Sequence, residues 1–212
     1  MVTPGMRRYK VRTPAQAELV GPEGDAPLDL PALFGRRAPL RLELGCGHGE
    51  FISAMAAAHP DEDFVGCEFE HLRVTKTAHH CRKRGAGNVR LFAGEGERLL
   101  PRLGDALFHR IYVLFPDPWP KLAHRRRRLM TLATLRQLTR VCAPGGRLIF
   151  ASDTHEYALQ VLSNLTLLPG CWRTLHPPAG YAIDLPVRFP TVFERHKRAE
   201  GCTIMQVAAV RC

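Results

Sequence analysis

The segment "LFPDPWPK" at residues 114–121 places a carboxylate, an aromatic ring and a cation within eight positions. Phe115, Asp117 and Trp119 each precede a proline. Proline fixes its own φ angle and restricts the residue before it, so the loop is expected to be stiff. A fixed Asp117 can accept hydrogen bonds from the edge of a base, while Trp119 offers a stacking surface. The simpler alternative is a rigid turn around a buried tryptophan.

Four consecutive arginines, Arg125–Arg128, follow this loop and precede an expected helix. Positive charge at a helix N-terminus opposes the macrodipole, so a solvated charged face would carry these arginines at the other end. We therefore predict that the run binds phosphates, and Arg125 and Arg126 are assigned to the substrate. The net charge of +10 also suggests a nucleic-acid partner, although a proteome that uses arginine as its general solubiliser would explain the charge equally.

A second group of residues lies in "LELGCGHGEF" at residues 42–51. Gly45 and Gly47 let the backbone bend tightly and approach a ligand that a Cβ atom would obstruct, so they are candidate cofactor-binding residues. The GxGxG spacing differs from the GxGxxG of dinucleotide-binding loops. A plain strand-to-helix turn has similar glycines, so the loop alone does not decide the ligand.

Three glutamates accompany the glycine loop. Glu68 follows Gly45 by 23 residues and can accept both hydroxyls of an adenosine ribose. Glu43 lies in an apolar strand, where a carboxylate is costly unless paired, and the ammonium of a bound amino-acid moiety would suit it. Glu95 follows a third strand and can accept from an adenine amino group, or can favour the N-terminus of the next helix instead. Together these residues fit S-adenosylmethionine better than a dinucleotide.

Short apolar runs alternate with helix-like segments from residue 40 onward. This alternation predicts a doubly wound α/β fold with a mainly parallel sheet, whose ligands bind beyond the carboxyl ends of the strands. Residues 1–38 are punctuated by prolines and are expected to form a basic arm rather than a packed element, ahead of one domain over 39–212. The expected strands are 40–44, 63–68, 89–93, 111–115, 147–152, 172–175 and 203–210, and the expected helices are 51–56, 70–84, 129–142 and 156–168.

Composition limits the class of protein. The chain has 212 residues, of which 45% are hydrophobic, as in one folded domain. No apolar stretch approaches the roughly 18 residues of a membrane span, and no apolar segment follows the basic N-terminus as in a signal peptide. The seven cysteines and the histidines show no spacing typical of metal ligands. We therefore expect a cytoplasmic protein with reduced thiols, no membrane contact and no metal.

Six motifs are distributed over residues 40 to 195. They are "ELGCGHGEF" at 43–51, "GCEFE" at 66–70, "NVRLFAGE" at 88–95, "FPDPWPKLAHRRRR" at 115–128, "ASDTHEYA" at 151–158 and "PTVFE" at 190–194. These motifs resemble those of the bacterial tRNA (guanine-N7)-methyltransferases. The resemblance implies a Rossmann-like class I methyltransferase with a seven-stranded sheet over 39–212, acting as a monomer or a homodimer. It also implies S-adenosylmethionine as methyl donor and tRNA as partner, with N7 of a variable-loop guanosine (position 46 of the tRNA) as target.

The same resemblance assigns residues to the site. The residues implied to line the S-adenosylmethionine site or its junction with the target are Glu43, Glu68, Glu95 and Asp117. Those implied to meet the guanosine are Lys121, Asp153, Thr191, Phe193 and Glu194. The chain departs from the family where Glu95 replaces the usual Asp and Val192 replaces a basic residue, whose phosphate contact Arg188 or Arg195 can supply. Asp153 alternatively caps the helix that follows it.

The chemistry of the target atom indicates how such a site would work. Guanine N7 carries a lone pair and no proton, so no general base is needed, and a carboxylate contributes mainly through position. We expect catalysis by alignment and by removal of water from N7. Asp117, the predicted catalytic residue, would hold the Watson–Crick edge of a flipped-out guanine with Asp153 and Glu194. Trp119 or Phe193 would pack on the face of the base.

Two other classes of function stay open from the sequence. One is a methyltransferase that uses S-adenosylmethionine on another RNA or on a small molecule, although the basic run argues against a small molecule. The other is a non-catalytic RNA-binding protein that has kept the fold, against which Gly45, Gly47, Glu68 and Asp117 argue. A nicotinamide-dependent dehydrogenase fits less well because of the glycine spacing.

Overall fold

A computed structural model describes residues 19–20, 24–184 and 189–212 of the chain. The described strands are β1 Leu19–Val20, β2 Leu40–Leu44, β3 Asp63–Glu68, β4 Val89–Ala93, β5 Phe108–Leu114, β6 Cys142–Ser152, β7 Trp172–Thr174, β8 Ala182–Ile183 and β9 Met205–Arg211. The described helices are α1 Leu30–Phe34, α2 Glu50–Ala58, α3 His71–Lys83, α4 Gly96–Leu99, α5 Leu132–Val141, α6 His155–Thr166 and α7 Val192–Ala199, with 3₁₀ turns η1 Leu100–Arg102 and η2 Leu122–Arg127.

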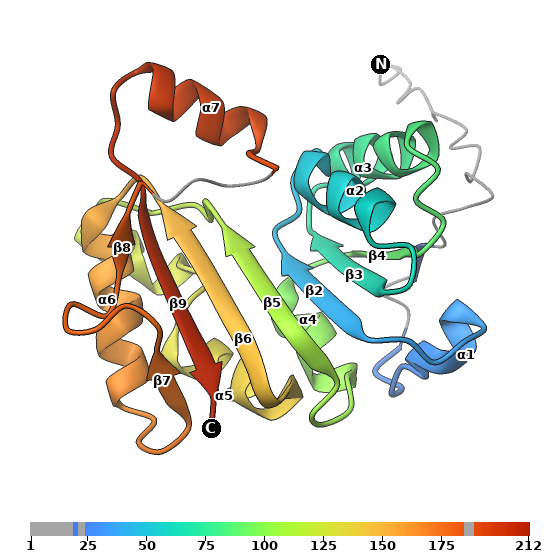
Figure 1. Cartoon of the computed structure of the whole chain (residues 1–212), viewed down its shortest axis with the longest axis horizontal. Helices are drawn as coiled ribbons and strands as arrows, with labels where there is room; N and C mark the ends of the chain where they lie inside the picture. Colours follow the sequence, from blue (N-terminus) through green and yellow to red (C-terminus); the bar gives the residue numbers. More distant parts are fainter. Residues whose placement is uncertain (1–18, 21–23, 185–188) are drawn as a thin grey trace, which may run out of the picture.

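The described strands form one sheet in the order β1-β4-β3-β2-β5-β6-β9-β7, and β8 pairs with β9 (Figure 1). The first six strands run parallel to one another, whereas β9 is antiparallel to β6, β7 and β8. Strand order reverses between β2 and β5, which is the switch point where open α/β sheets bind ligands. The doubly wound, mainly parallel fold predicted from the sequence is therefore confirmed.

Helices cover the two faces of the sheet unequally. Helices α2 and α3 pack on β2–β4 through Ile52, Val74 and their neighbours, and form the smaller core. Helices α5 and α6 pack on the other face through Leu138, Val161 and their neighbours, and form the larger core. We name the face of β5, β6, β9 and β7 that is turned away from α5 and α6 the open face. Figure 1 shows no helix among the described residues in front of β5, β6 and β9.

All seven strands predicted from the sequence are present. The sheet has nine strands within the described residues, because β1 and β8 add two residues each. β6 begins at Cys142 rather than Arg147, since the segment 143–146 is absorbed as an irregularity between two registers with β5. None of the described helices is long and apolar enough to cross a membrane.

The prediction of an unpacked arm over residues 1–38 is wrong for residues 24–38. Leu30 of α1 is 2% exposed and belongs to the larger core. Asp29 caps α1 by accepting a hydrogen bond from the Ala32 N–H at 3.1 Å, and Arg90 Nε donates to the Leu33 carbonyl at 2.9 Å. Residues 1–18 and 21–23, including the basic segment at 6–12, lie outside the described residues.

Candidate active site

The carboxyl ends of five adjacent strands bring most of the predicted site residues to one edge of the sheet. The glycine loop follows β2, Glu68 ends β3 and Glu95 follows β4. Asp117 follows β5 and Asp153 follows β6, so the order β4-β3-β2-β5-β6 places them in one line along this edge. Helix α7 lies beyond the same edge (Figure 1).

The glycine loop is fixed by contacts with β3 and α3. Gly45 and Gly47 have φ angles of +77° and +56°, which side-chain-bearing residues rarely adopt, and a Cβ atom at either position would meet open space. The Gly47 N–H donates to Glu68 Oε2 at 3.0 Å, and Thr77 Oγ1 donates to the Gly47 carbonyl at 2.9 Å. Gly49 approaches α3 so closely that a Cβ atom would lie 2.4 Å from Thr77 Cγ2. Nothing in the sequence around Thr77 indicated this contact.

Glu68 organises the end of β3. Its side chain is buried, and its Oε1 accepts a second hydrogen bond from the Glu70 N–H at 3.0 Å. A carboxylate offers about four acceptor positions, so two remain for a ligand. Glu68 is therefore both a support for the glycine loop and a candidate acceptor for ribose hydroxyls.

Glu43 carries a buried carboxyl group inside β2. The residue is 4% exposed, and its Oε2 has no hydrogen-bond partner among the described residues. Burial, together with the nearby charges of Glu50 and Glu68, raises the pKa of Glu43 to about 8. A cationic group bound beside Glu43 would supply the missing partner and favour its ionised form.

Glu95 is exposed and immediately precedes α4. Its side chain makes no capping hydrogen bond to this helix. Its position still allows the charge to favour the N-terminus of α4, so this alternative and the adenine contact both stay open.

The loop that contains Asp117 is strained as well as proline-rich. Phe115 and Trp119 have φ angles of +52° and +40°, a conformation uncommon for bulky residues. Asp117 lies between them, is exposed, and forms no hydrogen bond or ion pair with another described residue. Such strain persists only where the surroundings enforce it, typically at functional sites. The loop thus presents a carboxylate in a fixed position.

The arginine run has two different roles in the structure. Arg128 is 1% exposed, and its guanidinium donates to the Pro118 carbonyl at 2.7 Å, to Glu156 Oε2 at 2.9 Å and to Gln160. The prediction that the whole run binds phosphates is therefore wrong for Arg128, which anchors the loop of Asp117. Arg125 is half-buried and pairs with Glu156 at 3.1 Å.

The remaining basic residues of this segment face outward. Arg126 and Lys121 are exposed and form no ion pair among the described residues. Arg127 is exposed, and its guanidinium carbon lies 5.1 Å from the centroid of the Trp119 ring. The ring of His124 packs edge-on against Trp119 at 5.9 Å. Trp119 is therefore half-buried between the side chains of Arg127 and His124 rather than enclosed in the core.

We expect Arg128→Gln to lower the free energy of unfolding by about 3 kcal/mol, because it leaves the Pro118 carbonyl without its donor and opens a cavity. Arg126→Gln, the same change two residues earlier, is expected to stay within about 0.5 kcal/mol of the wild type. Urea unfolding followed by circular dichroism measures both. Equal stabilities of the two variants would show that Arg128 does not anchor the loop.

Asp153 faces α7 rather than its own helix. Its Oδ2 lies 3.9 Å from Lys197 Nζ. The N-cap residue of α6 is Thr154, whose N–H is held by Ser152 Oγ at 3.0 Å. The alternative that Asp153 caps this helix is therefore wrong. Lys197 also lies over the Phe193 ring at 5.6 Å, and this lysine was not among the site residues predicted from the sequence.

Helix α7 brings Phe193 to the site but turns Glu194 inward. The Phe193 ring is 44% exposed and packs 5.2 Å from the ring of Phe115. Thr191 caps the helix by accepting from the Glu194 N–H at 3.0 Å. Glu194 is 2% exposed, and its Oε1 accepts from Arg198 at 2.8 and 3.0 Å.

The structure thus assigns Thr191 and Glu194 to holding α7 in place, in contrast to the expected contact with guanosine. Arg195 donates to the Pro190 carbonyl at 2.7 Å and keeps its charge exposed. Arg188, the other candidate to replace the basic residue at Val192, lies outside the described residues.

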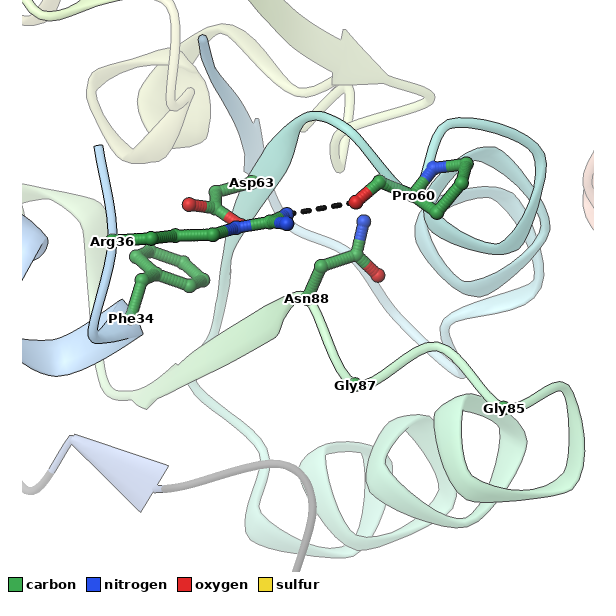
Figure 2. A pocket seen from close by; sticks show the side chains of 7 residues that line it. All are labelled: Phe34, Arg36, Pro60, Asp63, Gly85, Gly87 and Asn88. Carbon is green, nitrogen blue, oxygen red and sulfur yellow. Dashed lines mark hydrogen bonds and ion pairs between the residues drawn. The ribbon is translucent and has the colours of Figure 1, made fainter. Parts of the chain in front are cut away.

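A pocket of about 340 Å³ lies away from this edge, at the amino ends of β3 and β4 (Figure 2). Its main polar contact joins Arg36 to Asp63 Oδ1 at 2.7 Å and to the Pro60 carbonyl at 2.8 Å. The pocket holds none of the predicted site residues. Its lining residues are Phe34, Arg36, Pro60, Asp63, Gly85, Gly87 and Asn88. Across the described ranges, no group of three or more His, Cys, Asp or Glu side chains could hold a metal ion.

Comparison with solved structures places the fold among methyltransferases. A 16S rRNA (adenine(1408)-N(1))-methyltransferase from Catenulisporales acidiphilia, solved with its cosubstrate S-adenosylmethionine, matches with a TM-score of 0.57 at 18% identity, covering 82% of this chain and 85% of that one. The 16S rRNA methyltransferase KamB matches with a TM-score of 0.59 at 18% identity, covering 86% and 93%. At these identities the likeness shows the fold alone.

Comparison with protein sequences identifies the family. A family model described as "Putative methyltransferase" matches residues 37–207. A tRNA (guanine-N(7)-)-methyltransferase of Methylococcus capsulatus is 39% identical over 83% of this chain and 76% of its own length. The enzyme of the same name from Alkalilimnicola ehrlichii is 40% identical over 85% and 76%. The chain therefore belongs to the family of the tRNA (guanine-N(7)-)-methyltransferases.

Proposed function

We propose that this protein transfers the methyl group of S-adenosylmethionine to N7 of a guanosine in the variable loop of tRNA. The observation that carries the proposal is the alignment, along one edge of the sheet, of the glycine loop with its carboxylates and of the rigid Asp117 loop with its basic neighbours. Family membership supports the reaction and the tRNA substrate. We further propose residues 39–212 as the catalytic domain and the cytoplasm as its location.

The residues present fit S-adenosylmethionine. Glu43 has a buried Oε2 without a partner among the described residues, which suits the ammonium of the methionine moiety. Gly45 and Gly47 leave open space beside the backbone where a Cβ atom would stand. Glu68 has free acceptor positions for the ribose hydroxyls, and Glu95 is exposed beside the loop that follows β4. When bound, S-adenosylmethionine supplies a methyl group activated by the positive sulfur.

The protein's own contribution to the reaction is placement. Guanine N7 has no proton to lose, so Asp117 acts by holding the base edge and not by removing a proton. Because φ angles and prolines fix its loop, Asp117 loses little freedom when the base binds. Phe193 and Trp119 supply apolar surface that excludes water from the base. Asp153, Lys121 and Arg126 are exposed or half-buried at the same edge and hold the remaining groups of the nucleotide.

The proposal is tested with labelled S-adenosylmethionine and an unmodified tRNA transcript, followed by nucleoside analysis. We expect the label in N7-methylguanosine within the variable loop. Label in another nucleoside or position would retain a methyltransferase and refute the proposed target. Binding of the cofactor without transfer to any tRNA would instead favour the non-catalytic RNA-binding alternative. Light scattering of the same preparation distinguishes a monomer from a homodimer.

A further inference from the structure

The open face of the sheet carries a row of arginines that the active site does not use. Arg41 of β2 pairs with Arg110 of β5, which in turn pairs with Arg147 of β6. Arg147 pairs with Val210 of β9, and Val210 pairs with Arg173 of β7. Residues that pair directly across strands project from the same face of a sheet. The four arginines therefore form one row across five adjacent strands.

Most of this charge is not neutralised within the described chain. Arg41 is the exception, since its Nη2 donates to Glu62 Oε1 at 2.6 Å. Arg147 and Arg173 are exposed and form no ion pair among the described residues. Arg110 is half-buried beside Arg147, and both burial and this neighbour lower its pKa. Like charges placed directly opposite each other on neighbouring strands destabilise a sheet, so the row is suited to an anionic partner.

We propose that Arg110, Arg147 and Arg173 bind the phosphate backbone of the tRNA substrate at a contact separate from the site of methyl transfer. The proposal rests on the proposed function. Strands lie about 4.8 Å apart, so the three arginines span about 14 Å across the sheet. Arg147 precedes Asp153 by six residues of extended chain, which places the row about 20 Å from the active-site edge. The row thus contacts a part of the tRNA remote from the methylated base.

Charge favours RNA over the other partners that could cover this face. A second copy of the chain would bring a like arginine row and a net charge of +10 against it. The N-terminal segment of the chain is itself basic, with Arg7, Arg8 and Lys10. RNA is the polyanion with which the enzyme must associate, and arginine is well suited to bidentate contact with phosphate.

The test compares two charge-removing variants that alter opposite faces of the sheet. The double variant Arg147→Gln/Arg173→Gln removes two charges of the row. The control, Arg136→Gln, removes one exposed arginine of α5 on the opposite side of the sheet, so the effects are compared per charge removed. Equilibrium binding of a tRNA transcript is measured by fluorescence anisotropy at several salt concentrations. Single-turnover methylation at saturating tRNA is measured in parallel.

We expect the double variant to bind tRNA about tenfold more weakly and to lower the slope of log K against log salt concentration by about 1.5 to 2. Its single-turnover rate should equal that of the wild type, and Arg147→Lys/Arg173→Lys should restore the slope. Per charge removed, the Arg136→Gln control should change the tRNA affinity and the salt slope by less than the double variant does.

Four results would overturn the inference. If the double variant keeps the wild-type affinity and salt slope while wild-type protein methylates tRNA, the arginine row does not bind tRNA, and the proposed function is unaffected. If Arg136→Gln loses as much tRNA affinity per charge removed as the double variant, the effect comes from net charge and not from the position of the row. A wild-type dimer that the double variant abolishes, seen by light scattering, assigns the row to a second copy. Wild-type protein that neither binds nor methylates tRNA refutes the proposed function together with this inference.

Discussion

Asp117→Ala is expected to lower the rate of methyl transfer to tRNA by about 100- to 1000-fold while leaving the fold intact. The size of the effect follows from the role of positioning, because a displacement of about 1 Å at the reacting atoms costs about 100-fold in rate. The fold should persist because Asp117 is exposed and bonds to no other described residue, so its removal changes stability by no more than about 0.5 kcal/mol. Single-turnover kinetics and thermal unfolding measure the two quantities.

A matched control is available for this variant. Asp61 is an exposed aspartate at the amino end of β3, on the far side of the sheet from the site. Asp61→Ala removes the same group and should keep the wild-type rate. Cofactor binding by Asp117→Ala, measured by calorimetry, should persist, since the carboxylates of β2 and β3 are untouched. Full activity in Asp117→Ala would remove the central residue from the proposed mechanism.

Glu43→Gln is expected to abolish a pH dependence of stability that the wild type shows without cofactor. In the unfolded chain Glu43 ionises near pH 4.5, whereas in the folded protein its pKa is about 8. Between these values the folded state holds one proton more than the unfolded state, so the free energy of unfolding falls as pH rises. From pH 5.5 to 8, this single group lowers the free energy of unfolding by about 3 kcal/mol. Glutamine has no proton to lose, so the variant should gain that much relative to the wild type over the same range.

The same substitution should weaken binding of the cofactor. Glu43→Gln is therefore expected to raise the stability of the cofactor-free protein and to lower its affinity for S-adenosylmethionine. A charged hydrogen bond to the ammonium contributes about 1.5 to 3 kcal/mol, so S-adenosylmethionine should bind about 10- to 100-fold more weakly to Glu43→Gln. At pH 7 the wild type should release a proton on binding, because the ammonium restores the ionised Glu43, and the variant should not. Calorimetry in buffers of different ionisation enthalpy measures this proton.

Glu97→Gln, at an exposed glutamate of α4, is the control for both measurements and should behave as the wild type. Equal pH dependence of unfolding in Glu43→Gln and wild type would mean that Glu43 is ionised in the folded protein. Equal proton release by Glu43→Gln and wild type on binding S-adenosylmethionine would mean that its ammonium does not contact Glu43.

The sequence predicted the sheet and its functional edge because parallel strands carry their own signal. Strands such as β2 and β3 are buried on both faces, so they appear as short continuous apolar runs with clear ends. Once the strands were placed, topology required that the residues following them meet at one edge. The sequence also identified Glu43 as a candidate site residue, because a carboxylate inside an apolar run is unusual.

The burial of Arg128 could not be predicted from the sequence. The four arginines of the run are identical in type, and only the fold brings Glu156 and Gln160, residues 28 and 32 positions later, against one of them. Thr77 was missed for the same reason, since its contact with Gly47 joins residues 30 positions apart. Pairings of this kind depend on tertiary structure and leave no local pattern.

Other elements were missed although a signal was present. Helix α7 has no apolar stripe, but Thr191 and Glu194 have the Thr-x-x-Glu spacing of a capping box. Asp29 followed by Pro31 is likewise typical of a helix start, at α1. Hydrophobic periodicity outweighed these capping signals, and both helices were therefore overlooked.

The position of β9 sets a constraint on how the protein can be made. β9 lies inside the sheet, between β6 and β7, although it follows both in the chain. The 52 residues 153–204 lie between the end of β6 and the start of β9. At about 5 to 20 residues per second, a ribosome needs about 3 to 10 s to synthesise that interval, during which the edge of β6 has no partner strand. During translation, the nascent chain therefore passes through a stage in which an apolar strand edge can pair with neighbouring chains.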